Sequence, residues 1–466
     1  MRTPLSRSFT MALLLGTMAT QAQPTTVLTN PATFSQGEAG NASGLESQAW
    51  WQSFDDPTLD SLVRRAMEGS LSLQQAQART LQARATFGSA KSDRWPSVKA
   101  TASAIRSDTS DNATSPAMVT TATTLYQAGF DASWEVDLFG GKRKTKEAAQ
   151  ARYEASMEDL HAAYLTLAGD VATNYITLRG NQALLDITRH NAENQRQTVT
   201  LTVERHRLGL TSGLDTVQAK AQFASTTAEI PSLEASIRQS IHRISILLGM
   251  EPTALLEELS AAKPLPSAQG TLATGLPAEL LKRRPDLRSA ERSLKAAMAD
   301  IGAAKAELYP KFDLTFGLGL QSTQTSSFAS ISSRYWSIIP GLSLPIFNRG
   351  TLKANVAKRE AVYQESLAAF RATYHTALED VENALSNYYA EKGRRQDLEE
   401  SLDQSQQALA LAQERYQRGL TSFLDVLTAQ SSVQEAQRSL SQSEAKVLTH
   451  LISLHKALGG GWAATA

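Results

Sequence analysis

Two hydrophobic periods alternate along this chain of 466 residues. From residue 126 to 137 the even positions are apolar and the odd positions polar, the pattern of a β-strand with one face of each kind. Residues 312–321 repeat this alternation. A weaker alternation beside each stretch supplies a second strand, although Pro340 interrupts one of them. The pattern predicts two β-hairpins, at 96–139 and 310–347.

Each predicted hairpin is followed by a very long helical stretch. Apolar residues recur at steps of three and four from Leu367 to Tyr388, the period of a helix that packs lengthwise on its neighbours. A helix of about 65 residues is roughly 100 Å long, too long for one compact domain. The predicted rods cover 142–207 with 214–248, and 351–417 with 424–458.

The chain contains two copies of one structural unit. The stretch from Glu204 to Gly249 is echoed from Glu414 to Gly459 at a fixed offset of 210 residues. Two matched pairs extend the repeat upstream to the hairpins: Leu138-Phe139 with Ile346-Phe347, and Trp95-Pro96 with Tyr309-Pro310. The predicted division of the chain is a signal peptide (1–22), an extended segment (23–55), the first repeat (56–249), a proline-rich linker (250–285), the second repeat (286–459) and a tail (460–466).

Composition narrows the function classes. Arg2 and Arg7, the apolar run after them and the small residues up to Ala22 read as a secretory signal cleaved after Ala22. Without these two arginines, 44 basic groups face 46 acidic ones, which argues against a nucleic-acid partner. The absence of cysteine excludes a disulfide scaffold and a lipidated cysteine. No run of about 20 apolar residues offers a spanning helix.

No catalytic or cofactor chemistry is predicted. The seven histidines are scattered without the spacing of metal ligands, so no metal site is expected. Gly140-Gly141 before Lys142 lacks the spacing of a phosphate loop. Without a nucleophile–base or paired-carboxylate arrangement, an enzyme is not expected.

The strand faces leave two interpretations open. Their apolar sides are rich in Phe, Trp, Tyr and Leu, which suits an outer-membrane barrel, whereas two hairpins packed on the helices would show the same period. Four strands cannot close a membrane barrel, and an open strand edge is not stable in lipid. Strands in a membrane would therefore be pooled by several chains, and three chains would give twelve strands.

Several motifs together resemble one family. They are Trp50-Trp51-Gln52-Ser53-Phe54, Asp56-Pro57-Thr58-Leu59, Asp137-Leu138-Phe139-Gly140, the repeated Gly-Leu-x-x-x-Leu-Asp turn and the Leu-Pro-x-x-Leu-Leu-x-Arg-Arg-Pro-Asp-Leu linker at 276–287. The chain resembles the TolC-like outer membrane factors, in the branch associated with resistance-nodulation-division (RND) efflux systems. Many members of that branch carry a lipidated cysteine after the signal, and this chain has none.

The resemblance implies an α+β membrane protein in the outer membrane of a Gram-negative bacterium. Three identical chains would build a trimeric β-barrel, with four strands from each chain, that continues into a long α-helical coiled-coil barrel through the periplasm. A periplasmic adaptor (membrane fusion) protein and an inner-membrane RND-type pump would dock at the far end, and the barrel alone would hold the protein in outer-membrane lipid.

Two equivalent turns lie where the predicted rods reverse direction. They are Gly209-Leu210-Thr211-Ser212 and Gly419-Leu420-Thr421-Ser422. Glycine suits a helix stop, and Thr or Ser suits the cap of the next helix, so a plain helix–helix turn explains them. The resemblance implies in addition that these turns contact the adaptor.

Five residues beside the turns form a candidate periplasmic gate. A carboxylate in the first turn of a helix is favourable in any case, which explains Asp215 and Asp425 without a gate. In a trimer, Asp425 would form a ring of like charges that narrows the tunnel. The resemblance implies that Asp215 pairs with Arg415 or Tyr416, and that Leu424 adds an apolar constriction.

The polar strand faces carry acidic residues. Asp131, Glu135, Asp137 and Asp313 would line the lumen and favour cations, although a solvated polar face explains them equally.

The preferred function is a passive outer-membrane exit channel of a tripartite efflux pump. The alternatives are the outer-membrane channel of a type I protein secretion system and a periplasmic coiled-coil scaffold without a pore.

Overall fold

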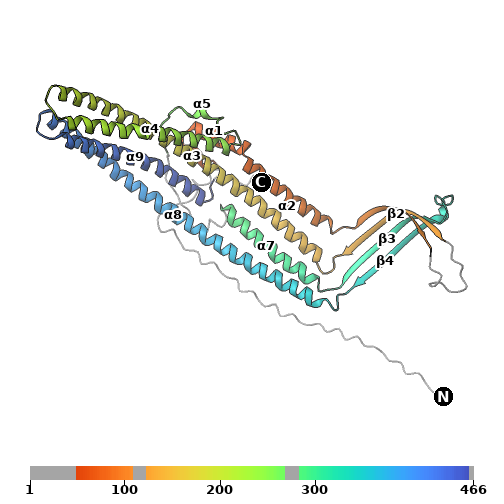
Figure 1. Ribbon diagram of the computed structural model, residues 1–466. Helices are drawn as coiled ribbons and strands as arrows, with labels where there is room; N and C mark the ends of the chain where they lie inside the picture. The colour runs from red at the N-terminus through yellow and green to blue at the C-terminus, as the bar shows by residue number, and fades with distance from the viewer. Residues whose placement is uncertain (1–48, 109–121, 268–282, 461–466) are drawn as a thin grey trace, which may run out of the picture.

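The chain is elongated, with a β-sheet at one end and helix–helix turns at the other (Figure 1). The structure, a computed structural model, describes residues 49–108, 122–267 and 283–460. The expected signal peptide, most of the extended lead-in and the helix signal at 276–281 lie outside the described residues. None of the described helices is long and apolar enough to cross a membrane.

One antiparallel sheet contains both hairpins, in the strand order β1-β2-β3-β4. The strands are β1 (Ser97–Ser107), β2 (Thr123–Val136), β3 (Lys311–Ser322) and β4 (Arg334–Ser343). β1 and β4 each have one edge that pairs with no other described strand. The expectation that Pro340 interrupts the strand is wrong, because Pro340 keeps its place in the ladder opposite Leu314 of β3.

The pleat separates the two sheet faces as the alternation predicts. Phe130 lies opposite Leu318, and Leu318 lies opposite Trp336, so large apolar side chains share one face, where all three are exposed. On the other face Gln127 Nε2 donates to Tyr335 Oη at 2.6 Å, from β2 to β4. Gly319 on β3 permits this contact, because a Cβ there would meet the Tyr335 ring at 2.9 Å.

The helices repeat in matched sets. The first set is α1 (Pro57–Gly69), α2 (Leu71–Ser92), α3 (Gly141–Arg207) and α4 (Gly213–Leu247). The second set is α7 (Pro285–Ala306), α8 (Arg349–Gln417) and α9 (Phe423–Ala457). Between the sets lies α5 (Leu256–Leu259), and two 3₁₀ helices span Trp50–Phe54 and Ile331–Ser333. α2 and α7 both have 22 residues, and α4 and α9 both have 35.

The main hydrophobic core joins the amino-terminal segment to the middle of the rods. Trp50 and Phe54 pack there with α1, α3, α4 and α9. His455 of α9 stacks on Trp50 with ring centroids 5.2 Å apart, and its Nδ1 is buried without a hydrogen bond to any residue that the structure describes. Burial lowers the pKa of His455 from 6.5 to about 4.

The Arg-Arg-Pro-Asp motif lies at the start of α7, and its Arg284 binds the carboxyl-terminal end of α9. The Arg284 guanidinium binds both carboxylate oxygens of Asp286 and one of Asp380 on α8. It also donates to the carbonyl of Ala457 at 3.2 Å, in the last turn of α9. Since that helix end carries partial negative charge, Arg284 joins α7, α8 and α9 at one point.

Candidate functional site

The two helix–helix turns have the same backbone. Gly209 and Gly419 are left-handed, with φ of 68° and 72°. The N–H of the leucine after each glycine bonds back to the carbonyl of Arg205 or Arg415, which closes a Schellman motif. Ser212 and Ser422 then cap the following helices. The interpretation as helix stops and caps is therefore correct at both turns.

The two equivalent carboxylates beside the turns have different partners. The Asp425 carboxylate accepts hydrogen bonds from the Thr421 hydroxyl and from both the hydroxyl and the backbone N–H of Ser422, which completes a capping box. The Thr421 bond is the main cause that lowers the pKa of Asp425. Asp215 instead lies 3.4 Å from the Tyr416 hydroxyl, which donates to it.

Tyr416 connects the two tips. Tyr416 lies on α8, where it is buried in a cluster with Ala219 of α4 and Phe423 of α9, and its ring centroid is 5.4 Å from that of Phe423. The guanidinium of Arg205, on α3, lies over the same ring at 4.9 Å. Burial is the main cause that raises the pKa of Tyr416, and the charge of Asp215 adds to it. Asp215, Arg205 and Tyr416 therefore form one cluster, the tip cluster, that links the first rod pair to the second.

Arg205 was not anticipated as a member of this cluster. The repeat aligns it with Arg415, which was expected beside Asp215. Among the described contacts Arg415 acts on Asp425 through its charge. Leu424 is exposed beside the second turn.

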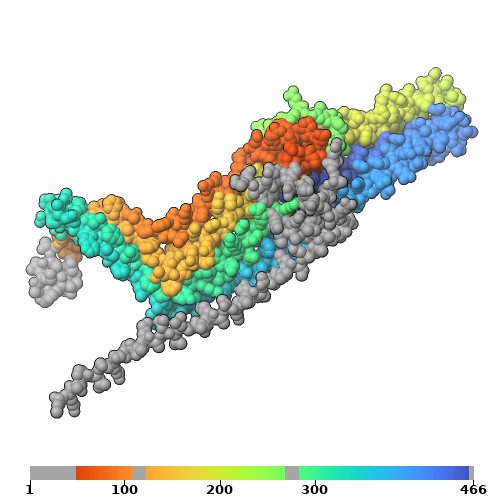
Figure 2. Space-filling model, turned by 180° about the vertical axis from the view of Figure 1, so that it is seen from behind, coloured from red at the N-terminus to blue at the C-terminus, as the bar shows by residue number. Residues whose placement is uncertain are grey.

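Exposed leucines surround both turns. Their side chains have more than half of their surface exposed, and the set consists of Leu208, Leu210, Leu214, Leu420 and Leu424. The two tips lie side by side at one end of the molecule (Figure 2). The exposed leucines of the two tips form an apolar surface patch, and such patches often mark interaction sites.

Behind the tips, α3, α8 and α9 enclose a groove of about 420 Å³, and half of the residues that line it are Asn or Gln. Asn191 on α3 donates to Gln437 on α9 at 2.9 Å, and Gln222 on α4 donates to Gln434 at 3.2 Å. Both polar atoms of the Gln195 carboxamide are buried in this groove without a hydrogen bond to any described residue. We call this row of contacts between the rod pairs the amide seam.

Asp131 and Glu135, two of the acidic residues expected along the lumen, each contact another side chain. Asp131 accepts from the Thr101 hydroxyl at 2.7 Å, and Glu135 forms an ion pair with Lys142 at 3.2 Å. Glu135 lies directly opposite Asp313 in the sheet register.

Asp137 differs from the prediction, because β2 ends at Val136. The carboxylate of Asp137 accepts from the backbone N–H groups of Lys142 (3.1 Å) and Arg143 (2.7 Å) and so caps α3.

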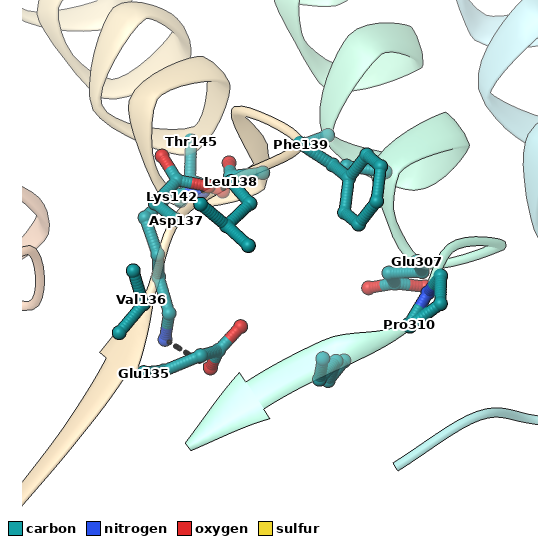
Figure 3. Close-up of a pocket in the computed structure, with 13 residues that line it drawn as sticks. Glu135, Val136, Asp137, Leu138, Phe139, Lys142, Thr145, Glu307 and Pro310 are labelled. Atoms are coloured by element: carbon teal, nitrogen blue, oxygen red, sulfur yellow. Dashed lines mark hydrogen bonds and ion pairs between the residues drawn. The ribbon is translucent and has the colours of Figure 1, made fainter. Parts of the chain in front are cut away.

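The junction of sheet and helices holds a cavity of about 150 Å³ (Figure 3). Glu135 and Lys142 lie on one side of it, and Glu307 and Pro310 on the other. At its rim Phe139 stacks on Tyr309, with centroids 4.7 Å apart and an angle of 15° between the rings. Among the described residues no group of three or more His, Asp and Glu side chains is arranged to hold a metal ion.

A sheet with one exposed apolar face that continues into paired helical rods defines the class of protein: a channel subunit of the outer membrane. The family model described as "Outer membrane efflux protein" matches residues 62–250 and 276–460. The chain belongs to this family.

Relatives match over nearly the whole chain. The pyoverdine export outer membrane protein OpmQ of Pseudomonas putida is 33% identical, over 97% of both chains. Nodulation protein T of Rhizobium leguminosarum bv. viciae is 32% identical, over 95% of this chain and 90% of its own length. Among solved structures, the outer-membrane channel OprN is 34% identical with a TM-score of 0.85, and the match covers 93% of this chain and 95% of that one.

Membership confirms the resemblance, the fold class and the location. The protein is an outer membrane efflux protein of a Gram-negative bacterium that extends into the periplasm, and its four strands are one chain's share of a β-barrel that continues into a helical barrel.

Proposed function

We propose that this protein is the passive exit channel of a tripartite efflux pump and that it works as a homotrimer. The observation that supports this proposal most strongly is the sheet: among the described strands β1 and β4 each keep one unpaired edge, and one face of the sheet is apolar and exposed. Three copies supply twelve strands, enough to close a membrane barrel, whereas one copy cannot. The opposite, polar face then lines the pore, with Asp131, Glu135 and Asp313 on it.

The tips are the proposed docking site for a periplasmic adaptor, through which an inner-membrane RND-type pump delivers cargo. The residues are those of the two turns, Gly209-Leu210-Thr211-Ser212 and Gly419-Leu420-Thr421-Ser422. The exposed leucines of these turns support this role, because Leu210 and Leu420 are both 64% exposed at the extreme end of the molecule. The names of similar proteins mention export of pyoverdine and efflux of toluene and antibiotics, which supports a small-molecule cargo.

The tip cluster is the proposed latch of the periplasmic gate. Asp215 and Tyr416 connect the rod pairs within one chain, and Arg205 holds the tyrosine ring in place. Asp425, Arg415 and Leu424 remain the proposed constriction, although Asp425 is engaged in its own helix cap.

The experiment is complementation in a strain that lacks its own outer-membrane efflux channel but keeps the adaptor and pump. Expression of this chain should lower the intracellular level of a fluorescent pump substrate, and the protein should stay in the outer membrane after a salt wash. A protein that washes off and leaves accumulation unchanged would support the non-pore scaffold. Export of a polypeptide with no effect on small molecules would support a type I secretion channel.

A further inference from the structure

The repeat places an unmatched aromatic side chain near each free edge of the sheet. Trp95 precedes the edge strand β1 and is 73% exposed, and Phe347 follows the edge strand β4 and is 101% exposed. Large aromatic side chains stabilise a protein mainly when they are buried. Exposure of Trp95 and Phe347 to water is therefore unfavourable.

Within one chain the equivalent residues are already paired. Phe139 belongs to the first copy and Tyr309 to the second, and their rings stack. In the repeat, Phe139 corresponds to Phe347 and Tyr309 corresponds to Trp95. The stack of Phe139 in the first copy on Tyr309 in the second copy therefore has an equivalent that is not formed within one chain. That equivalent would join Phe347 of the second copy to Trp95 of a first copy.

We propose that this counterpart forms between chains: Phe347 stacks on the partner subunit's Trp95 at the periplasmic end of each subunit boundary. The proposal rests on the homotrimer proposed above and adds the contact that aligns its subunits. It needs no rearrangement, because β4 and β1 are the two free edges that must meet when the sheet closes.

The same correspondence predicts the register between subunits. Phe130 on β2 lies opposite Leu318 on β3. Their counterparts are Ile338 on β4 and Ala104 on β1, which places Ile338 opposite the partner subunit's Ala104. Both residues lie on the apolar face of their own strands, so the predicted register keeps that face continuous across the boundary.

The helices support the same boundary. α7 packs between α3 and α8, and its buried residues include Ala296, Ala297 and Ala299. Its counterpart α2 packs on α3, but Leu73 and Ala90 are its only buried residues among those described. The repeat assigns the exposed side of α2 to α8 of the partner subunit, on the same boundary as the aromatic pair.

Cysteine cross-linking tests the register without background, because the chain has no native cysteine. Ile338→Cys combined with Ala104→Cys should give covalent dimers and trimers on oxidation in outer membranes. Ile338→Cys with Ala102→Cys should give far less, because diagonal neighbours are about 7–8 Å apart, beyond disulfide reach. Phe130→Cys with Leu318→Cys is the matched positive control, a pair within one chain. Stronger cross-linking through position 102 would overturn the register.

A double-mutant cycle tests the aromatic contact. Trp95→Ala and Phe347→Ala should each speed trimer dissociation in detergent about three- to tenfold, and the double variant should be no faster than either single one. Leu138→Ala, an exposed residue of an equivalent turn, is the control that leaves dissociation unchanged. The proposed contact would be refuted if the double variant dissociated at the product of the two single effects, or if neither single variant changed the dissociation rate. A purified chain that is monomeric in native electrophoresis would instead refute the trimeric channel itself.

Discussion

Replacement of Tyr416 by phenylalanine should weaken the closed state of the channel. The variant keeps the ring, its contact with Phe423 and the stacked Arg205, and it removes only the hydroxyl that donates to Asp215. A hydrogen bond to a charged group contributes about 1.5–3 kcal/mol; this one is long, at 3.4 Å, so about 1 kcal/mol per chain is expected. Three copies in a trimer would give about 3 kcal/mol, roughly a 100-fold shift toward the open state.

The assay is single-channel recording of the purified trimer in planar lipid bilayers. Tyr416→Phe should raise the open probability, and Asp215→Ala should do the same, with no further increase in the double variant because each change removes the same hydrogen bond. Tyr389→Phe, on an exposed part of α8, is the matched control and should behave as the unmodified protein. If Tyr416→Phe forms trimers of normal stability and its open probability is unchanged, the tip cluster is not a latch.

Three further outcomes follow from local geometry. The pKa of His455 is about 4 in the folded protein and 6.5 in the unfolded chain. The free energy of unfolding should therefore be highest above pH 6.5 and fall by about 2–3 kcal/mol as the pH drops to 4. His455→Phe should remove this pH dependence in melting curves. Asp425→Ala should speed amide hydrogen exchange in the first turn of α9 and leave the first turn of α4 unchanged, since it removes the capping box. Gly419→Ala should cost about 1 kcal/mol because its φ is 72°, whereas Gly393→Ala, inside α8 with open space around it, should stabilise by up to about 1 kcal/mol in denaturant titrations.

The rods and hairpins could be predicted closely because local patterns determine them. The rod expected at 142–207 is α3 from Gly141 to Arg207, since the helical period is long and left-handed Gly209 ends it. The strand expected at 126–137 begins earlier, at Thr123, because backbone pairing with Ser107 of β1 extends it where the side-chain alternation is weak.

The partners within the candidate site could not be predicted in the same way. Asp215 and Asp425 follow the same Gly-Leu-Thr-Ser turn, yet the carboxylate of Asp215 accepts from Tyr416 of the other rod pair and that of Asp425 caps its own helix. The hydrogen-bond partner of each carboxylate depends on which helices are neighbours in space. The same packing places Arg205 of α3 over the Tyr416 ring. The stack of His455 on Trp50 joins the two ends of the described chain, a separation at which no local period applies.

The amide seam has a mechanical consequence. A seam of leucines has one best register, because each side chain fills one hole on its neighbour. A carboxamide both donates and accepts, so it finds a similar partner one turn further along. The buried carboxamide of Gln195, which has no hydrogen bond to a described residue, lies among such side chains in the groove. A joint of carboxamides therefore has no single best register, and a shift of one rod pair along the other by one turn would exchange hydrogen bonds instead of losing them.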